Sequence, residues 1–470
     1  MAEGSVMMMV VLVCSTLHVL PGMHRAIAAA SHGPGEAEPV WTRKGAAWPG
    51  SGSNSPSVTV GPFQTVFNHS SQACNENDFP DTSARAFRDR DGNIQIIAVN
   101  SLSSHRLIST MLNPDNATMV RDCHQPLMTS GFNADPSQFD DQLWIQAVYT
   151  ADGKTIHAIV HDEFHGERHN VSGLCPTHIM DDCWYCTLLG AVSYDAGKTF
   201  QLHPLEERIV AALPQTYPQG MGHRVGLAQN TGIVRNPNDG MFYFMALRSQ
   251  SLYGNKTSKE ETAPDGMCVF RTNNVSDPTS WYAWDGAGYN AKMVNPYTLQ
   301  KSGGDPNQHI CHIIPQRDNS LRFSLYFSTF YNKFMLVGTC HCDLSSPSTP
   351  QCVPEGIGKH AHMHSHTNHE RYRDPAHPTQ AFCFALSDNL ITWSDPFYIM
   401  NVTSIQTWST HHSDGTSGQW YPALVDATQP GYNLDRVGES AYLFFVYFHP
   451  KVKDYGKSRD LWRASVKFSK

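Results

Sequence analysis

Short apolar segments joined in pairs by tight polar turns recur along this chain, and no long amphipathic helical window interrupts them. Three of the turns carry an Asp-Gly pair, at residues 91–92, 152–153 and 239–240. These residue types tolerate positive φ, so such turns between alternating apolar runs are a strong hairpin signal. Hairpins are predicted over residues 84–99, 143–160, 231–247, 318–327 and 420–448. The chain is therefore expected to be all-β.

Five hairpins and a last strand at Leu461–Phe468 fit a ring of four-stranded sheets. We predict a single β-propeller with five blades, and six blades are the alternative. The hairpins lie about 60 to 120 residues apart, which is more than one blade needs, so the surplus is expected in loops. Residues 340–377 show no strand pattern and are interpreted as an insertion. Its alternating histidines suit zinc or copper, but no ligands at fixed spacing accompany them, so a mobile loop is expected.

Two turns that follow expected outer strands carry a recognisable pattern. Residues 193–200 read SYDAGKTF, and residues 387–393 read SDNLITW. The first resembles the Asp-box of sialidase-like propellers, with Phe200 in place of tryptophan. The second is similar to the corresponding turn of five-bladed glycosidases of the arabinanase, xylosidase and invertase type. In such a box the carboxylate accepts hydrogen bonds from its own turn, so Asp195 is interpreted as a residue of the fold.

The N-terminal region predicts a secreted protein. Residues 1–30 combine an apolar stretch with the small-residue run Ala26–Ser31, the order found in a secretory signal peptide. Residues 31–56 are rich in Gly, Pro and Ser and are expected to be loosely ordered, and the propeller is expected to occupy residues 57–470. Six N-glycosylation sequons agree with this route, at Asn68, Asn116, Asn170, Asn255, Asn274 and Asn401.

Cysteine usage agrees with an oxidising compartment. Of the 12 cysteines, Cys14 lies in the predicted signal peptide, which leaves 11. We expect most of these to pair and one to remain, with Cys175–Cys183 as a local bridge. A redox or zinc role for the Cys183-x-x-Cys186 spacing is the minor alternative.

Charge and hydropathy restrict the partners. The net charge is −8 over 470 residues and no basic stripe occurs, which argues against nucleic acid as a partner. No later run approaches the roughly 18 apolar residues that a membrane span needs. No cofactor is expected, and a carbohydrate is the expected partner.

The hairpins define a candidate site, because residues just before the first strand and just after the second strand of each blade meet at one mouth of the channel. The candidate catalytic residues are Asp81, Asp141, His161 and Glu163, and the candidate substrate-binding residues are Arg85, Arg224, Arg248 and Tyr421. Asp81 is interpreted as base or nucleophile, Glu163 as general acid, and Asp141 as the charge that tunes the acid. Strand-entry caps, blade-to-blade ion pairs and core packing are the structural alternatives. The resemblance implies an acidic Glu on the third blade, which the sequence lacks, and Glu163 is the nearest substitute.

A secreted glycoside hydrolase acting on an extracellular polysaccharide or glycan is the leading hypothesis. A polysaccharide lyase is a second, since His161 and Tyr421 are residue types that abstract and return protons. A non-catalytic glycan-binding or adhesion propeller is the third. Convergence of Asp81, Asp141 and Glu163 with separated pKa values would favour an enzyme.

Overall fold

The computed structural model describes residues 55–109, 119–217, 224–249, 266–314, 321–343, 351–353, 379–402, 417–449 and 458–470. All of them belong to one unit that extends from Gly50 to Lys470. The predicted signal peptide and the run of alternating histidines lie outside the described residues. Within the described ranges, no helix is long and apolar enough to cross a membrane.

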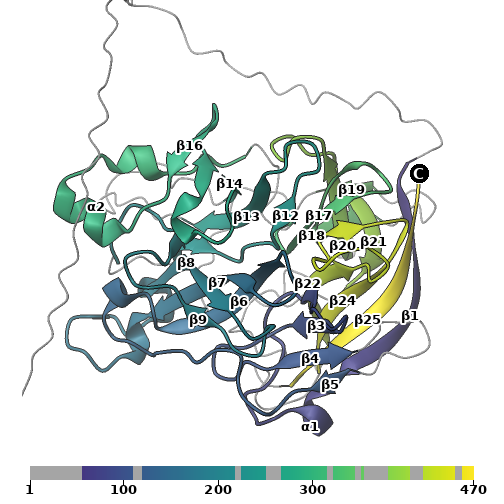
Figure 1. Ribbon diagram of the computed structural model, residues 1–470, viewed down its shortest axis with the longest axis horizontal. Helices are drawn as coiled ribbons and strands as arrows, with labels where there is room; N and C mark the ends of the chain where they lie inside the picture. Colours follow the sequence, from purple (N-terminus) through teal and green to yellow (C-terminus); the bar gives the residue numbers. More distant parts are fainter. Residues whose placement is uncertain are drawn as a thin grey trace, which may run out of the picture. The chain divides into compact units, whose positions relative to one another are not determined.

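The described strands form four hydrogen-bonded sheets, one of which joins two antiparallel meanders through the parallel pairing of β8 (Trp184–Ser193) with β11 (Val225–Ala228). The antiparallel meanders are five in all and are numbered in chain order (Figure 1). Meander 1 contains β2 (Arg85–Arg88), β3 (Ile94–Ile97), β4 (Arg106–Ser109) and β5 (Val120–Arg121). Meander 2 contains β6 (Gln142–Thr150), β7 (Ile156–His165), β8 (Trp184–Ser193), β9 (Gln201–Leu202) and β10 (Ile209–Ala211). Meander 3 contains β11 (Val225–Ala228), β12 (Val234–Arg235), β13 (Phe242–Ser249), β14 (Gly266–Thr272), β15 (Tyr282–Trp284) and β16 (Tyr289–Lys292).

Meander 4 contains β17 (Ser324–Ser328), β18 (Lys333–Asp343), β19 (Gln351–Val353), β20 (Thr379–Ser387) and β21 (Phe397–Asn401). Meander 5 contains β22 (Gly418–Val425), β24 (Ser440–Phe448), β25 (Arg459–Ser469) and β1 (Ser57–Phe67), while β23 (Arg436–Val437) pairs in parallel with β17. The helical segments are short: α1 (His69–Gln72), α2 (Pro296–Ser302), η1 (Pro136–Gln138), η2 (Gly166–Arg168), η3 (Met180–Asp182), η4 (Pro278–Ser280) and η5 (Pro306–His309).

A separate apolar cluster fills the interface between each meander and the next, including the interface between meanders 5 and 1. Representative buried pairs, in ring order from meander 1, are Phe87 with Ile145, Ile159 with Phe244, Met245 with Phe334, Phe382 with Phe445, and Phe444 with Ile96. The innermost strands also line one shared cavity, with Ala86, Val148, Ile233, Leu325 and Leu424 among the lining residues. The prediction of an all-β single propeller is confirmed.

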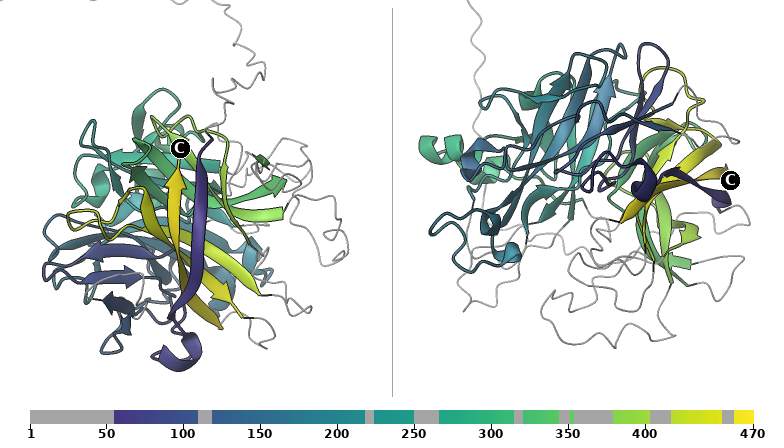
Figure 2. Two further views of the ribbon diagram at one scale, coloured as in Figure 1. Left: turned by 90° about the vertical axis from the view of Figure 1, so that its right-hand side faces the viewer. Right: turned by 90° about the horizontal axis from the view of Figure 1, so that it is seen from below.

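The first strand of the chain completes the last meander. β1 pairs antiparallel with β25, from Ser57 opposite Ser469 to Phe67 opposite Leu461. Figure 2 shows this purple strand beside the yellow C-terminal strand. Residues from both ends of the described chain therefore share one sheet, which closes the ring.

The Asp-Gly turns lie where the sequence predicts them. Gly92, Gly153 and Gly240 have φ of 86°, 66° and 72°, which a residue with a Cβ adopts only under strain. The proposed turn of the fourth hairpin, at 318–319, lies outside the described residues. The strand predicted after it, β17, forms a hairpin with β18. Asn332, with φ 55°, supplies the positive φ of the turn between these strands, which carries no glycine.

Five disulfides pair ten of the cysteines, as Cys74–Cys123, Cys175–Cys183, Cys268–Cys311, Cys340–Cys383 and Cys342–Cys352. The predicted Cys175–Cys183 bridge is confirmed, and Cys186 is the free, buried cysteine among the described residues. The start of the predicted 340–377 insertion was read wrongly: β18 continues to Asp343, and β19 pairs with its end. The end of β18, residues 338–343 with the sequence GTCHCD, lacks the apolar alternation on which the sequence argument relied.

Candidate active site

The HDEFH sequence is the end of a strand. β7 continues to His165 because it pairs on both sides, with β6 from Gln142 and with β8 as far as Trp184. Side chains alternate along a strand, so His161, Glu163 and His165 share one face. Asp162 lies on the opposite face. The sequence therefore places an acidic residue between two histidines on a single surface.

Asp81 precedes β2 and accepts hydrogen bonds from four donors. They are Tyr421 Oη at 3.3 Å, Trp144 Nε1 at 3.3 Å, Asn100 Nδ2 at 3.1 Å and Arg459 Nη1. The Asp81 side chain is 11% exposed. Burial raises the pKa of Asp81 above its ordinary value, although the Arg459 charge opposes the rise. The carboxylate is thus held in one orientation, with both oxygens occupied by donors.

Glu163 lies between two imidazoles, with Oε1 3.5 Å from His161 Nδ1 and Oε2 3.1 Å from His165 Nε2. Burial alone would raise the pKa of Glu163, but the two histidines and Arg224 outweigh burial and lower it to about 2. Burial lowers the pKa of His161 to about 4. The free protein therefore holds Glu163 as a carboxylate at neutral pH, whereas a general acid must carry a proton.

The structure brings five of the predicted site residues together: Asp81, His161, Glu163, Arg224 and Tyr421. Burial raises the pKa of Asp81, and the charge of Glu163 adds to that rise. Burial and the charge of Asp81 raise the pKa of Tyr421, and the charge of Glu163 adds a smaller contribution. The Arg224 charge acts on both Glu163 and His161. The guanidinium of Arg224 lies 5.0 Å from the ring centre of Trp184. Meanders 1, 2 and 5 and the residue before β11 thus contribute to one site.

Asp141 lies behind this site. Its Oδ2 accepts the backbone N–H of His165 at 2.8 Å and lies 3.1 Å from His169 Nε2. Burial raises the pKa of Asp162 to about 7. The backbone N–H of Asp141 opposes this rise through a hydrogen bond, and the charge of Asp141 adds to it. Asp141 therefore holds the backbone of β7, and its electrostatic influence falls on Asp162, whereas it was expected to fall on Glu163.

Arg85 and Arg248 point into the fold. Arg248 donates to the Cys311 carbonyl at 2.5 Å. Arg85 is 7% exposed, and burial lowers its pKa to about 10, so it remains cationic at neutral pH. Its acceptors come from meanders 2, 3 and 4 and are the carbonyls of Gln146, Asn230 and Phe323 and the hydroxyl of Ser324.

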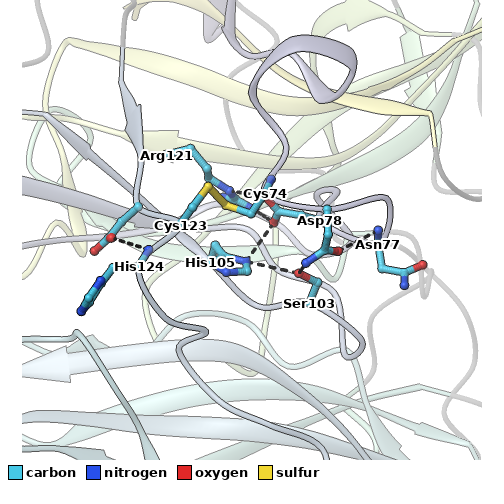
Figure 3. The surroundings of a disulfide bond; sticks show 10 residues. Cys74, Asn77, Asp78, Ser103, His105, Arg121, Cys123 and His124 are labelled. Carbon is cyan, nitrogen blue, oxygen red and sulfur yellow. Dashed lines mark hydrogen bonds and ion pairs between the residues drawn. A yellow bond between two sulfur atoms is a disulfide. The ribbon is translucent and has the colours of Figure 1, made fainter.

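Asp78, which precedes β2 together with Asp81, serves a structural cluster. It accepts from Arg121 Nε at 2.9 Å and from the Cys74 N–H at 2.9 Å, and it lies 3.5 Å from His105 Nδ1 (Figure 3). Burial alone would raise the pKa of Asp78, but these partners outweigh burial and lower the pKa well below its ordinary value. The cluster lies against the Cys74–Cys123 disulfide and fixes the start of meander 1.

Sequence reasoning missed three residues that donate to Asp81, namely Asn100 and two strand residues, Trp144 and Arg459. Trp144 lies in β6, and Arg459 is the first residue of β25. The rule that selected residues flanking the strands passes over side chains within them. The strand-initial position of Arg459, just before the predicted last strand, is the signal that could have identified it.

Three side chains of metal-binding type meet in this site, since ligand atoms of His161, Glu163 and Cys186 lie within 4.8 Å of one another. Burial and the Glu163 charge raise the pKa of Cys186 well above its ordinary value, so its sulfur stays a thiol. The Arg224 charge acts on the same group of residues.

No protein-family model matches the chain, and no curated protein matches it in sequence. Similar solved structures include a glycosyl hydrolase from Bacteroides ovatus, 9% identical, covering 87% of this chain and 94% of that one, with a TM-score of 0.40. Another comes from work on mannoside phosphorylases and glycoside hydrolases that target β-1,2-mannosidic linkages in Candida mannan, with 10% identity, 87% and 94% coverage and a TM-score of 0.41. A B. megaterium levansucrase variant is 9% identical, with 86% and 81% coverage and a TM-score of 0.39. These sequence identities and TM-scores are too low to support a conclusion about this chain. The fold assignment rests on the strand pairing described above.

Proposed function

We propose that this protein is a secreted glycoside hydrolase that acts on an extracellular polysaccharide or glycan. The observation that carries the proposal is a pair of partly exposed carboxylates, Asp81 and Glu163, whose charges interact and whose pKa values shift in opposite directions. Glycosidic hydrolysis uses two carboxyl groups that differ in protonation at some point of the cycle. Separation of pKa values within one pair is the physical mark of such a site.

The proposed roles follow from the contacts. Asp81 is the base or nucleophile, since four donors orient it and burial raises its pKa, which increases its basicity. Glu163 protonates the leaving oxygen together with His161 and His165, the two histidines that lie beside its carboxylate. Arg224 contacts substrate, and the half-buried Trp184 ring beneath its guanidinium holds it in place by a cation–π contact. Arg85 and Arg248 are left out of the substrate site because their guanidinium groups bind the fold.

Secretion is supported by the five disulfides, which require an oxidising compartment to persist. The sequon asparagines Asn170, Asn274 and Asn401 are exposed and suit glycan attachment. Asn68 does not, because its side chain caps α1 and donates to Asp460 Oδ2 at 3.0 Å. The sequons at 116 and 255 lie outside the described residues.

The lyase alternative has weaker support. A lyase base must lose its proton readily, but burial and Asp81 raise the pKa of Tyr421 well above its ordinary value. The Tyr421 hydroxyl is also engaged with Asp81. A non-catalytic glycan-binding propeller is the outcome that remains if no turnover is found.

The test is a screen of the purified protein on a panel of polysaccharides and glycans, with new reducing ends as the readout. Glu163→Gln and Asp81→Asn are each expected to lower kcat by about 10²–10⁴-fold, because each removes a proton-transfer group. Asp388→Asn is the matched control, since Asp388 is 61% exposed and pairs with Lys333 in meander 4, outside the site. Full activity in Glu163→Gln would refute the assignment. Binding without turnover would favour the adhesion propeller, and unsaturated products that absorb in the ultraviolet would indicate a lyase.

A further inference from the structure

His165 lies between two carboxylates. Its Nε2 is 3.1 Å from Glu163 Oε2, and its Nδ1 is 3.4 Å from Glu167 Oε1. The His165 side chain is 3% exposed, and its ring centre lies 5.1 Å from that of Trp184. An imidazole with a carboxylate at each nitrogen is stabilised in its doubly protonated, cationic form.

The surrounding backbone holds this geometry. Asp141 accepts the His165 N–H, and the next N–H, of Gly166, donates to the Cys183 carbonyl at 2.9 Å. A Cβ at position 166 would lie 2.3 Å from the Tyr217 hydroxyl, so any other residue here would displace the Tyr217 side chain. The turn at Gly166 starts η2 and brings Glu167 back onto the His165 ring. The Cys175–Cys183 disulfide anchors the other side of the turn.

We propose that His165 is a positioning residue that stores a proton for Glu163, with Glu167 holding the imidazolium in place. This relay rests on the proposed function and deepens it, because it supplies the proton that Glu163 lacks in the free protein. The separation of 3.1 Å between His165 Nε2 and Glu163 Oε2 is hydrogen-bond distance, so the proton moves without rearrangement of the backbone.

The cycle balances as follows. His165 Nε2–H passes its proton to Glu163 Oε2, and Glu163 passes it to the glycosidic oxygen as the bond from that oxygen to the anomeric carbon breaks. One water supplies hydroxide to that carbon, and Asp81 takes its other proton. Asp81 returns that proton to solvent, and His165 regains one from solvent. The net change is addition of one water across the glycosidic bond.

The charges around His165 give the direction of its pH dependence. Burial lowers the pKa of His165, but Glu163 and Glu167 outweigh burial and raise it, while Arg168 opposes the rise. The other groups facing this part of the site are His161 on β7, Arg224 before β11 and the Cys186 thiol on β8. A raised pKa extends to higher pH the range over which the ring carries its second proton, and the stored proton is lost as pH rises through the pKa. Turnover is therefore expected to fall on the alkaline side.

The first test needs no substrate. Histidine ring resonances of the intact protein are followed by NMR between about pH 5 and pH 9, and the His165 resonance is assigned by its loss in His165→Gln. We expect a pKa above the ordinary value of about 6.5, and a fall of about 1 unit in Glu167→Gln. His157→Gln is the matched control on the same strand and is expected to change neither result. A His165 pKa at or below 6.5, or one unaffected by Glu167→Gln, would overturn the relay.

The second test uses a glycan that the panel shows to be a substrate, together with the same sugar on a leaving group that needs no protonation, such as dinitrophenolate. His165→Gln is expected to lower kcat on the glycan by about 10²-fold with little change in KM, and to leave kcat on the activated glycoside unchanged. Glu167→Gln is expected to move the alkaline limb of kcat to lower pH, and this measurement tests the relay even if His165→Gln does not fold.

Equal losses on both substrates, or an unmoved limb, would contradict the relay. A wild-type protein inactive on every glycan contradicts the proposed function, whereas an ordinary His165 pKa in an active enzyme contradicts the relay alone.

Discussion

Arg85 connects the innermost strands of the ring. Its guanidinium donates to groups in meanders 2, 3 and 4, and one acceptor, Ser324 Oγ, donates in turn to the Pro422 carbonyl in meander 5 at 2.9 Å. Since Arg85 itself belongs to meander 1, one hydrogen-bond network reaches all five. The bonds end on backbone carbonyls and a hydroxyl, so the arginine satisfies buried acceptors that the narrow centre of the ring leaves without strand partners.

Arg85→Met is therefore expected to destabilise the fold by roughly 2–5 kcal/mol, because it keeps the bulk of the side chain but leaves several buried acceptors unpaired. Urea unfolding followed by tryptophan fluorescence measures this. The control is Arg90→Met, at an exposed position in the following turn, which should change the free energy of unfolding by less than about 0.5 kcal/mol. A stable Arg85→Met protein with weakened glycan binding would restore Arg85 to the substrate site.

Single residues show where sequence reasoning stops. Position relative to a strand selected Asp81, Glu163 and Tyr421, which the structure brings together, because the ends of strands in a ring face one mouth. The same rule selected Arg85, whose side chain is buried by the alternation along β2. His161 and His165 are the main causes that lower the pKa of Glu163, and Arg224, 61 residues along the chain, adds a smaller contribution that no local pattern reveals.

At the scale of elements, the Asp-box serves its own turn, as its resemblance implies. Asp195 Oδ1 accepts the N–H groups of Lys198 and Thr199 at 3.0 Å each, and Oδ2 accepts the Thr199 hydroxyl at 2.7 Å. Gly197 provides φ 81° in the same turn. Such local contacts lie within a few residues of one another, and for this reason the sequence predicts them well.

Asp195→Ala is expected to lower the unfolding temperature and secretion yield while the specific activity of folded protein stays unchanged. The cost should be about 1–3 kcal/mol, since the turn N–H groups lose their acceptor. Asp388→Ala is the control in the second box, where the exposed Asp388 pairs only with Lys333 among the described residues. Loss of turnover at unchanged melting temperature would show that Asp195 belongs to the active site.

At the scale of the whole molecule, ring closure was the part that the sequence did not reveal. The last strand, β25, was expected, but its partner β1 lies about 400 residues earlier and carries the irregular sequence SVTVGPFQTVF. Gly61 and Pro62 interrupt the alternation, and the pairing shifts register between Val60 and Phe63. The register is thus fixed by β25 and by packing against meander 4, and neither is visible within an eleven-residue window.

The last prediction concerns the closure of the ring by β1. A variant that lacks residues 57–67 should fold less stably and self-associate, because it exposes the long edge of β25 and uncovers apolar residues such as Phe445 and Trp462. A synthetic peptide of residues 57–67 should restore the unfolding temperature by strand addition, since the edge of β25 supplies both the backbone partners and the register. Differential scanning calorimetry and size-exclusion chromatography, with and without peptide, measure both effects. A scrambled peptide is the control. Unchanged stability without β1, or equal rescue by the scrambled peptide, would mean that the ring is closed by the contacts among the other strands and that β1 only covers an edge.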